Sequence, residues 1–451
     1  MCTNSVPIRM YTNRNNAKIK RIIQFNMHSV FKVFVCIYKR ILRLTLNQVL
    51  LICAVFFISF FIWTWSNGEE KLSIDSSNPV IVWWTTGFPS TSETITCKEN
   101  LKCDVYSDKN GGKDNNVEAY LFYASNIHFD DLPLPRKASK VIWGLYHEES
   151  PRNVQELLHE PILSLFNYSA TFSRYSDIPF PLQYLDSWSD ITSKEYFVPT
   201  AKKNIFLEDI APILYLQSDC ETATERDAYV KELMKFINID SYGACLKNKE
   251  MPQKFRDDYL NNLNDNEFLH YIARYKFVLA LENGICEDYV TEKFWRAIKV
   301  GSVPIYFGSP SIQDWFPNNK SAILIQDYST PSNMSEYIKK LLKNDTLYEE
   351  HLIHKTKEVI TNNRLIQEFS SRPYQTDSLK VATKFECLVC KKLHEKKTKK
   401  LKEQVVTKSH YNCPKPISAL SLKVNPSNDW VYLWDKAKKD AEDLYKKVIN
   451  S

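Results

Sequence analysis

Residues 275–298 read YKFVLALENGICEDYVTEKFWRAI, and residues 302–308, SVPIYFG, follow shortly after them. The apolar run Phe277–Leu281 is typical of a strand that is buried on both faces of a parallel sheet. Thr291 stands where a helix N-cap belongs, and apolar side chains recur at helical spacing after it. We therefore predict a strand, a polar loop, a helix and a second strand.

Polar side chains gather between the predicted strand and the predicted helix. Lys293 would lie in the first helical turn, where a positive charge opposes the helix dipole unless an anion is bound nearby. In open α/β sheets, nucleotides bind at the carboxyl ends of the strands. A solvated loop with a surface ion pair is the alternative interpretation. The residues that make the loop a candidate nucleotide site are Glu282, Asn283, Asp288, Tyr289, Glu292 and Lys293.

The same residues resemble the donor-binding motif of the α1,3-fucosyltransferase family, in which Phe/Leu-Glu-Asn is followed by Asp-Tyr-Ile/Val-Thr-Glu-Lys and a Val-Pro-Ile/Val strand ending in Gly. The resemblance extends over residues 80–374. The segment 308–315, GSPSIQDW, and the pair Cys387-x-x-Cys390 resemble a divergent animal branch that has been connected with O-fucosylation of protein Ser and Thr. This resemblance implies GDP-fucose as the donor and leaves the acceptor open.

The fold that the resemblance implies is α/β, with two Rossmann-like domains facing a cleft, the GT-B glycosyltransferase architecture. We expect an acceptor-side domain over residues 80–204, a GDP-fucose-binding domain over 205–375, and a Cys-containing, Lys-rich tail over 376–451. Residues 184–204 look irregular and polar enough to link the two domains. The sequence pattern predicts strands at 80–84, 119–123, 140–146, 170–172 and 213–217, a helix at 224–236, and mostly helical structure over 334–364.

The amino-terminal part differs in charge from the rest of the 451-residue chain. Residues 1–48 hold nine of the 59 Lys and Arg and no acid, so the remainder carries 53 acidic residues against 50 basic ones. That balance argues against binding to nucleic acid. The uncharged run 49–65 predicts a transmembrane signal-anchor, with basic residues before it that orient the amino terminus to the cytosol. A signal peptide is the competing prediction, but the run starts late and no cleavage site follows it.

These features predict a single-pass type II membrane protein of the Golgi, the endoplasmic reticulum or both. Residues 1–48 would be a cytosolic tail, 49–65 the membrane span, and 66–79 a short stem that holds the lumenal catalytic part near the membrane. The short span favours the thinner membranes of the early secretory pathway. Sequons for N-glycosylation follow the span at Asn167, Asn319, Asn333 and Asn344.

Eight of the 11 cysteines lie after the predicted span, and an even number in an oxidising lumen suggests disulfides. A zinc site at Cys387 and Cys390 is the alternative, although Cys413 and the nearby histidines lack finger spacing. We predict that Cys97 and Cys103 pair with Cys387 and Cys390, and that Cys220 pairs with Cys245.

Transfer with inversion needs a carboxylate to deprotonate the acceptor hydroxyl and positive charge to stabilise the departing nucleoside diphosphate. By resemblance to a family Glu-Ser-Pro segment, the base is Glu149, at the end of the strand predicted over 140–146. Glu148 is the adjacent alternative. Glu149 would have only a structural role if it merely started a helix before Pro151.

The resemblance also implies the donor-binding residues. Arg226 is expected to contact phosphate, because its guanidinium can bind phosphate oxygens in a bidentate manner. A surface ion pair with Glu225 or Asp227 is the alternative. Two further family segments, around Asn167 and Arg174, are expected to frame the interdomain cleft. The remaining donor-binding candidates are Lys293 for the phosphates, and Asn283, Tyr289 and Glu292 for the ribose and fucose hydroxyls.

Absent motifs narrow the chemistry further. The chain has no Gly-x-Gly-x-x-Gly and no phosphate-binding Gly-Lys-Ser/Thr loop, which argues against dinucleotide oxidoreductases and P-loop kinases. Because Asp-x-Asp is also absent, we expect no required metal and no cofactor beyond the donor substrate GDP-fucose. Lys, Arg and helix N-termini would then neutralise the diphosphate.

The sequence thus predicts an inverting fucosyltransferase that modifies a hydroxyl on lumenal glycoproteins, with Ser or Thr of a folded protein favoured. The alternative acceptor is GlcNAc of N-glycans. A non-enzymatic alternative is a lectin-like or chaperone-like protein, against which the intact Glu149, Arg226, Glu292 and Lys293 argue. A homodimer is compatible with the sequence, which does not determine the assembly.

Overall fold

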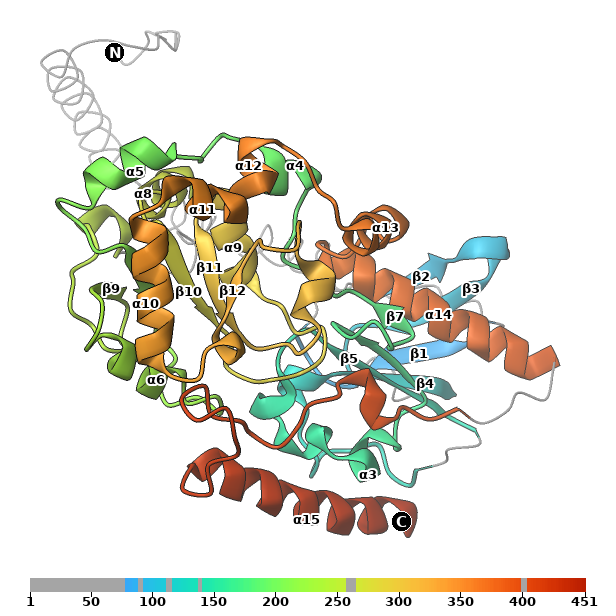
Figure 1. Ribbon diagram of the computed structural model, residues 1–451. Coiled ribbons are helices and arrows are strands. Elements are labelled where there is room, and N and C mark those ends of the chain that lie inside the picture. Colours follow the sequence, from blue (N-terminus) through green and yellow to red (C-terminus); the bar gives the residue numbers. More distant parts are fainter. Residues whose placement is uncertain (1–77, 88–91, 111–115, 137–139, 257–264, 399–403) are drawn as a thin grey trace, which may run out of the picture. The chain divides into compact units, whose positions relative to one another are not determined.

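The computed structural model describes residues 78–87, 92–110, 116–136, 140–256, 265–398 and 404–451. These residues form two sheets with flanking helices (Figure 1). The predicted cytosolic tail, the membrane span 49–65 and nearly all of the stem lie outside the described residues. Within the described ranges, no helix has both the length and the apolar character needed to span a bilayer.

The first sheet has seven strands in the order β2-β3-β1-β4-β5-β6-β7. Every neighbouring pair is parallel except β2 and β3. The strands are β1 (Val80–Trp83), β2 (Glu93–Thr96), β3 (Lys102–Tyr106), β4 (Val117–Tyr123), β5 (Ile142–His147), β6 (Tyr168–Thr171) and β7 (Ile178–Pro179).

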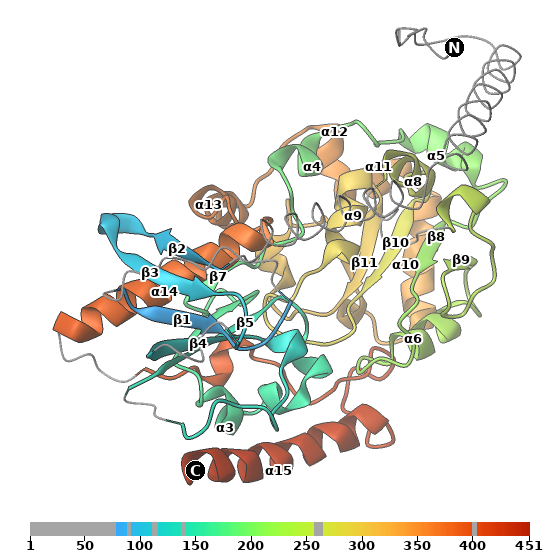
Figure 2. The ribbon, with the colours of Figure 1, turned by 180° about the vertical axis from the view of Figure 1, so that it is seen from behind.

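Two long helices from the end of the chain complete the core of this first sheet. Helix α14 (Ser378–Thr398) runs across one face, where Val381, Phe385 and Val389 pack against strand residues (Figures 1 and 2). Helix α15 (Asp429–Ile449) lies against α3 (Glu160–Leu163) and the turn before it. The region expected to be a tail therefore supplies core residues.

The second sheet has five parallel strands in the order β12-β11-β10-β8-β9. Apolar residues of α6 and α10 cover one face, and those of α8 and α9 cover the other. This burial on both faces explains the unbroken apolar run of β10. The strands are β8 (Ile213–Leu216), β9 (Ile239–Tyr242), β10 (Phe277–Leu281), β11 (Val303–Phe307) and β12 (Ile323–Leu324); the helices are α6 (Arg226–Leu233), α8 (Asn266–Ile272), α9 (Glu292–Val300), α10 (Pro331–Leu342), α11 (Asp345–Glu349), α12 (Ile353–Thr356) and α13 (Asn363–Ser371).

The central prediction is confirmed, since β10 spans Phe277–Leu281 and Thr291 caps α9. The prediction of an irregular segment over 184–204 is wrong. It contains α4 (Trp188–Thr192) and α5 (Thr200–Phe206), and Ser187 and Asp190 form a capping box at the start of α4. The short edge strands β2 and β9 were not predicted, because neither has a comparable local signal.

Four disulfides join the eight described cysteines. Cys97 pairs with Cys387 and Cys103 with Cys390, so the double link predicted from the sequence fastens α14 to the first sheet. The predicted Cys220–Cys245 pair is also present. The fourth disulfide, Cys286–Cys413, was not predicted.

Candidate active site

The carboxyl ends of β5 and β10 approach each other, and the loops that follow these strands are in contact. Gly284, after β10, packs closely on Ser150, after β5. A Cβ atom at position 284 would lie 2.6 Å from the Ser150 Oγ, which accounts for glycine at this point. The candidate site is built around this contact.

Glu148 and Glu149 directly follow β5 and make different contacts. The Tyr123 hydroxyl donates a hydrogen bond to Glu148, whose pKa is raised by burial. Glu149 instead accepts a hydrogen bond of 3.1 Å from the Tyr289 hydroxyl, which belongs to the loop after β10. Of the two carboxylates, Glu149 is therefore the one in contact with the predicted donor loop.

Tyr289 is buried, with 1% of its surface exposed. Burial and the charge of Glu149 raise the pKa of Tyr289 well above its usual range, so the phenol stays protonated and remains a donor. The sequence predicted that Tyr289 holds a donor hydroxyl. In the structure its own hydroxyl contacts the candidate base.

The backbone next to Tyr289 is held by the fully buried carboxylate of Asp288. Asp288 has a left-handed φ of 64° and accepts hydrogen bonds from Arg174, which follows β6, at distances down to 2.5 Å. Ser311 (2.8 Å) and Trp315 (3.1 Å) also donate to it. Both come from the GSPSIQDW segment, so the segment resembling the divergent branch helps to position the donor loop.

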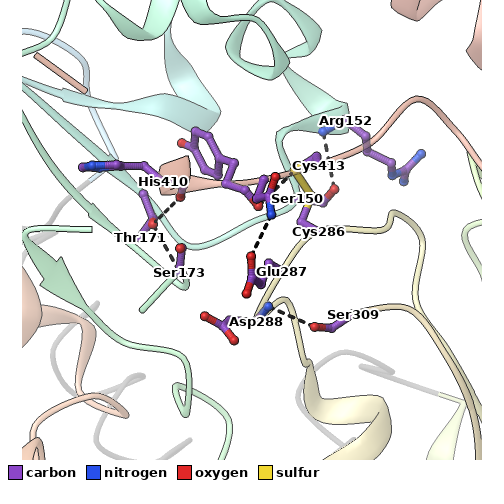
Figure 3. Close-up of a disulfide and its surroundings, with 12 residues drawn as sticks. Ser150, Arg152, Thr171, Ser173, Cys286, Glu287, Asp288, Ser309, His410 and Cys413 are labelled. Carbon is purple, nitrogen blue, oxygen red and sulfur yellow. Dashed lines mark hydrogen bonds between the residues drawn. A yellow bond between two sulfur atoms is a disulfide. The ribbon is translucent and has the colours of Figure 1, made fainter. Parts of the chain in front are cut away.

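The Cys286–Cys413 disulfide fastens the same loop to the segment before α15 (Figure 3). Close by, Asn412 donates a 2.7 Å hydrogen bond to Glu287, and Thr171 donates one of 3.0 Å to the His410 carbonyl. The loop after β10 is thus linked covalently and by hydrogen bonds to the carboxyl-terminal part of the chain.

Lys293 lies in the first turn of α9, as predicted, and contacts two carboxylates of the protein. Its Nζ lies 3.6 Å from Glu282 and 3.2 Å from Glu292. Burial would lower the pKa of Lys293, but the two carboxylates raise it. Glu282, fully buried, also accepts bonds of 2.8 Å from the amide and the hydroxyl of Thr291. The protein therefore supplies anions beside this lysine.

Glu292 is held in its charged form. Burial opposes ionisation, but Lys293 and Arg296 lower the pKa of Glu292 to about 2. It is therefore a permanent acceptor of hydrogen bonds at neutral pH. Asn283 is the remaining candidate on this loop, and its Oδ1 accepts no hydrogen bond from the residues that the structure describes.

Arg226 begins α6 and is buried, with 1% of its side chain exposed. It donates hydrogen bonds of 2.8 Å to the Leu281 carbonyl and 2.6 Å to the Asp219 carbonyl. The alternative of a surface ion pair is wrong, since Asp227 instead accepts a bond of 2.6 Å from the Tyr215 hydroxyl. Arg226 thus belongs to the carboxyl edge of the second sheet, near Lys293.

The sequons differ in accessibility. Asn167 is buried: its side-chain oxygen accepts from the amide of Trp143 at 2.9 Å, and its nitrogen donates to the Gln404 carbonyl at 3.0 Å. These contacts fit the framework role and leave no room for a glycan on that nitrogen. The exposed sequon residues are Asn319, Asn333 and Asn344.

A cavity of about 320 Å³ lies beside Glu148. Its walls come from both the first sheet and the segment before α14. Aromatic and amide side chains dominate the lining, a composition that suits hydroxyl-bearing ligands. They include Tyr123, Tyr146, Phe180, Gln183, Tyr184 and Gln375.

The described residues bring two groups of His, Cys and Asp within metal-binding distance. Each contains a disulfide, Cys103–Cys390 or Cys220–Cys245, whose sulfur atoms are not available as thiolates. The zinc alternative for Cys387 and Cys390 is thus wrong, because both are paired with cysteines of the first sheet region.

Sequence reasoning missed two charged residues at the site, Arg152 and Asp219, which form an ion pair of 2.6 Å between the loops after β5 and β8. Both follow strands at a carboxyl edge, and that position could have revealed them.

The chain is similar in sequence to known fucosyltransferases. Residues 76–183 match the family model described as "Fucosyltransferase, N-terminal", and residues 209–408 match "Glycosyltransferase family 10 (fucosyltransferase) C-term". The chain is 40% identical over 381 residues to the Xenopus laevis protein named GDP-fucose protein O-fucosyltransferase 3, covering 81% of this chain and 80% of that protein. It is 39% identical to the Homo sapiens protein of the same name, covering 84% and 81%. A crystal structure of an α1,3-fucosyltransferase with GDP-fucose matches with 18% identity and a TM-score of 0.40, covering 69% of this chain and 94% of that one.

Proposed function

The chain belongs to the fucosyltransferases of glycosyltransferase family 10, and we propose that it transfers L-fucose from GDP-fucose to a hydroxyl group of a protein. The relatives named above carry that activity in their names. The observation that carries the proposal is the contact between Glu149 and Tyr289, because it places a carboxylate of the first sheet against the loop expected to hold the donor.

In the proposed reaction, Glu149 removes the proton of the acceptor hydroxyl as that oxygen attacks the fucose carbon opposite the diphosphate. The fucose–phosphate bond breaks, and GDP leaves with the bonding electrons. Inversion follows from attack on the face opposite the leaving group. Arg226 and Lys293 would stabilise the negative charge that develops on the diphosphate.

Asn283 and Glu292 are proposed to bind hydroxyls of the donor. The uncommitted Oδ1 of Asn283 and the permanent charge of Glu292 make both of them acceptors. We propose that no metal is required, since Arg226 and Lys293 would neutralise the charge of the phosphates. Retention of activity in the presence of EDTA is the direct test.

We propose that the two sheets belong to a GT-B arrangement, in which the part built on the second sheet binds the donor and the part built on the first sheet binds the acceptor. We also propose a type II membrane anchor at 49–65 and a lumenal catalytic part in the early secretory pathway. The charge pattern of the amino-terminal residues supports the anchor. Microscopy of the full chain with a tag at each end, after permeabilisation of the plasma membrane alone or of all membranes, tests this topology.

The acceptor is proposed to be Ser or Thr of a folded, disulfide-rich domain. To test it, residues 66–451 are secreted and incubated with GDP-fucose, small disulfide-rich domains and GlcNAc-terminated glycopeptides. Mass spectrometry then locates the fucose. Fucose on Ser or Thr of the folded domains, lost when these are reduced, is expected. Fucose only on O3 of GlcNAc would identify the alternative activity.

A further inference from the structure

A single carboxylate oxygen lies between two arginines that come from different sheets. The Oδ2 atom of Asp219 is 2.6 Å from Nη2 of Arg152 and 3.7 Å from Nη2 of Arg226. Arg226 is a proposed phosphate ligand, whereas Arg152 has no role in the proposal so far. Figure 3 shows Arg152 beside Ser150 and the Cys286–Cys413 disulfide, at the junction of the two loops.

The two arginines are fixed in place. Arg226 is 1% exposed and donates to two backbone carbonyls. Arg152 is 12% exposed, and its guanidinium lies over the ring of Trp430 at 4.9 Å. Burial lowers the pKa of Arg152 while Asp219 raises it, and Arg226 is close enough to lower it further. Two guanidinium groups held this near each other repel unless an anion lies between them.

The anion between them is the least constrained member of the cluster. The Asp219 side chain is 51% exposed, and among the described residues its carboxylate accepts a hydrogen bond from Arg152 alone. Glu282, beside Lys293, is by contrast fully buried and accepts two hydrogen bonds from Thr291. The half-exposed Asp219 side chain can turn outward into solvent once another anion takes its place between the two arginines.

We propose that Arg152 is a further donor-binding residue, and that Asp219 occupies the position of a diphosphate oxygen between Arg152 and Arg226. This inference rests on the proposed function. Phosphate oxygens carry the negative charge and the acceptor geometry that guanidinium groups bind, so the diphosphate displaces the Asp219 carboxylate and takes over both arginines. Because Arg152 follows the candidate base Glu149 by three positions, phosphate binding then also aligns the loop that carries the base.

The inference predicts opposite changes in GDP affinity for two substitutions. Asp219→Asn removes the competing charge and is expected to tighten GDP binding roughly two- to fivefold. Arg152→Gln removes a charged contact and is expected to weaken GDP binding about tenfold or more. Arg152→Lys keeps the positive charge but loses the bidentate geometry of the guanidinium. Its GDP affinity should lie between those of Arg152→Gln and wild type. The detergent-solubilised full chain is used for all measurements, with GDP affinity determined by calorimetry and thermal denaturation recorded without nucleotide.

Guanosine, which lacks phosphate, is the matched ligand control. Its affinity, measured by ligand-observed NMR, should be the same in wild type and all three variants. Weaker GDP binding in Asp219→Asn, or unchanged GDP binding in Arg152→Gln and Arg152→Lys, overturns the inference. A parallel loss of guanosine binding in both Arg152 variants also overturns it, since Arg152 then supports the fold and not the phosphates. Failure of wild type to bind GDP would instead refute the proposed function.

Discussion

The hydroxyl of Tyr289 lies 3.1 Å from Oε2 of Glu149 and joins the loop after β10 to the end of β5. Because Asp288, the neighbouring residue, is fixed by Arg174, the position of this hydroxyl is set by residues of both sheets. Orientation of the candidate base therefore depends on order in the donor loop.

Glu149→Gln should abolish transfer while GDP affinity stays close to that of wild type. Gln has the size and hydrogen-bonding capacity of Glu but cannot take up a proton, and general base catalysis contributes about 10²–10⁴-fold. Glu148→Gln is the matched control, since Glu148 contacts Tyr123 instead of the donor loop. Turnover retained in Glu149→Gln and lost in Glu148→Gln would identify Glu148 as the base.

Tyr289→Phe should lower kcat about three- to tenfold, the value of one neutral hydrogen bond or slightly more. GDP affinity should not change, because the Tyr289 hydroxyl contacts Glu149 in the structure. Steady-state kinetics with calorimetry separates the two effects. A loss of GDP-fucose affinity with unchanged kcat would mean that Tyr289 binds the donor, as the family resemblance implied.

Lys293→Ala should weaken GDP binding by about tenfold or more, as expected for the loss of a charge-assisted contact. It should also reduce stability, because Glu282 would remain buried without its cation. Burial already raises the pKa of Glu282. A carboxyl with a raised folded pKa destabilises the fold as pH rises past its unfolded pKa.

The stability deficit of Lys293→Ala should therefore grow from acid to neutral pH, and Glu282→Gln should relieve it in the double variant. Thermal denaturation across this pH range is the measurement. Lys299→Ala, on the same helix but paired with Asp190, is the control for loss of a charge from α9 and should leave GDP affinity unchanged.

Glu386→Gln should stabilise the protein in mild alkali. Glu386 lies on α14, and burial raises its pKa from 4.5 to about 7. Trp83 of the first sheet donates a hydrogen bond to it. The folded state binds the proton more tightly, so stability is greatest below the ordinary pKa and falls as pH rises through about 7.

Gln keeps the acceptor for Trp83 and cannot ionise. The variant should match wild type near pH 5 and exceed it at pH 8 by up to about 3 kcal/mol, the equivalent of the pKa difference. Urea unfolding at both pH values measures this gain. Equal stability at pH 8 would mean that Glu386 is not held in a buried, protonated form.

Removal of one of the two parallel disulfides, Cys97–Cys387 or Cys103–Cys390, should cost much less stability than removal of both. Each alone closes a loop of about 290 residues, worth about 6 kcal/mol in the chain-entropy treatment. Once one is present, the second closes only a short loop. Denaturant unfolding of the paired Cys→Ala variants, alone and combined, tests this non-additivity.

The sequence predicted the second sheet well because its signals are local. The apolar run of β10 and the Thr291 cap of α9 each act within a few residues. Residues 184–204 misled prediction because their polar composition hides two short helices whose stability comes from packing: Ile191 and Thr200 are buried.

The motifs name candidate residues of the site but not all of their contacts. Lys293 pairs with Glu282 and Glu292, which are close to it in sequence. Glu149 and Tyr289, by contrast, meet across 140 residues of sequence and from different sheets. Arg152 and Asp219 each follow a strand at a carboxyl edge, but nothing in the sequence indicates that the two side chains pair with each other. Contacts of this kind depend on how two sheets meet, which single-sequence patterns do not encode.

Helix α14 places a constraint on the order in which the chain can fold during synthesis. The ribosome delivers β1, β3, β4 and β5 long before it delivers the helix that covers them, and Cys97 waits 290 residues for Cys387. Until then Ile81, Leu121 and their neighbours form an uncovered apolar surface on the nascent chain, and such surfaces bind chaperones or aggregate. The first sheet is consequently made first and completed last, so truncations after the second sheet should yield an insoluble product, not a smaller working enzyme.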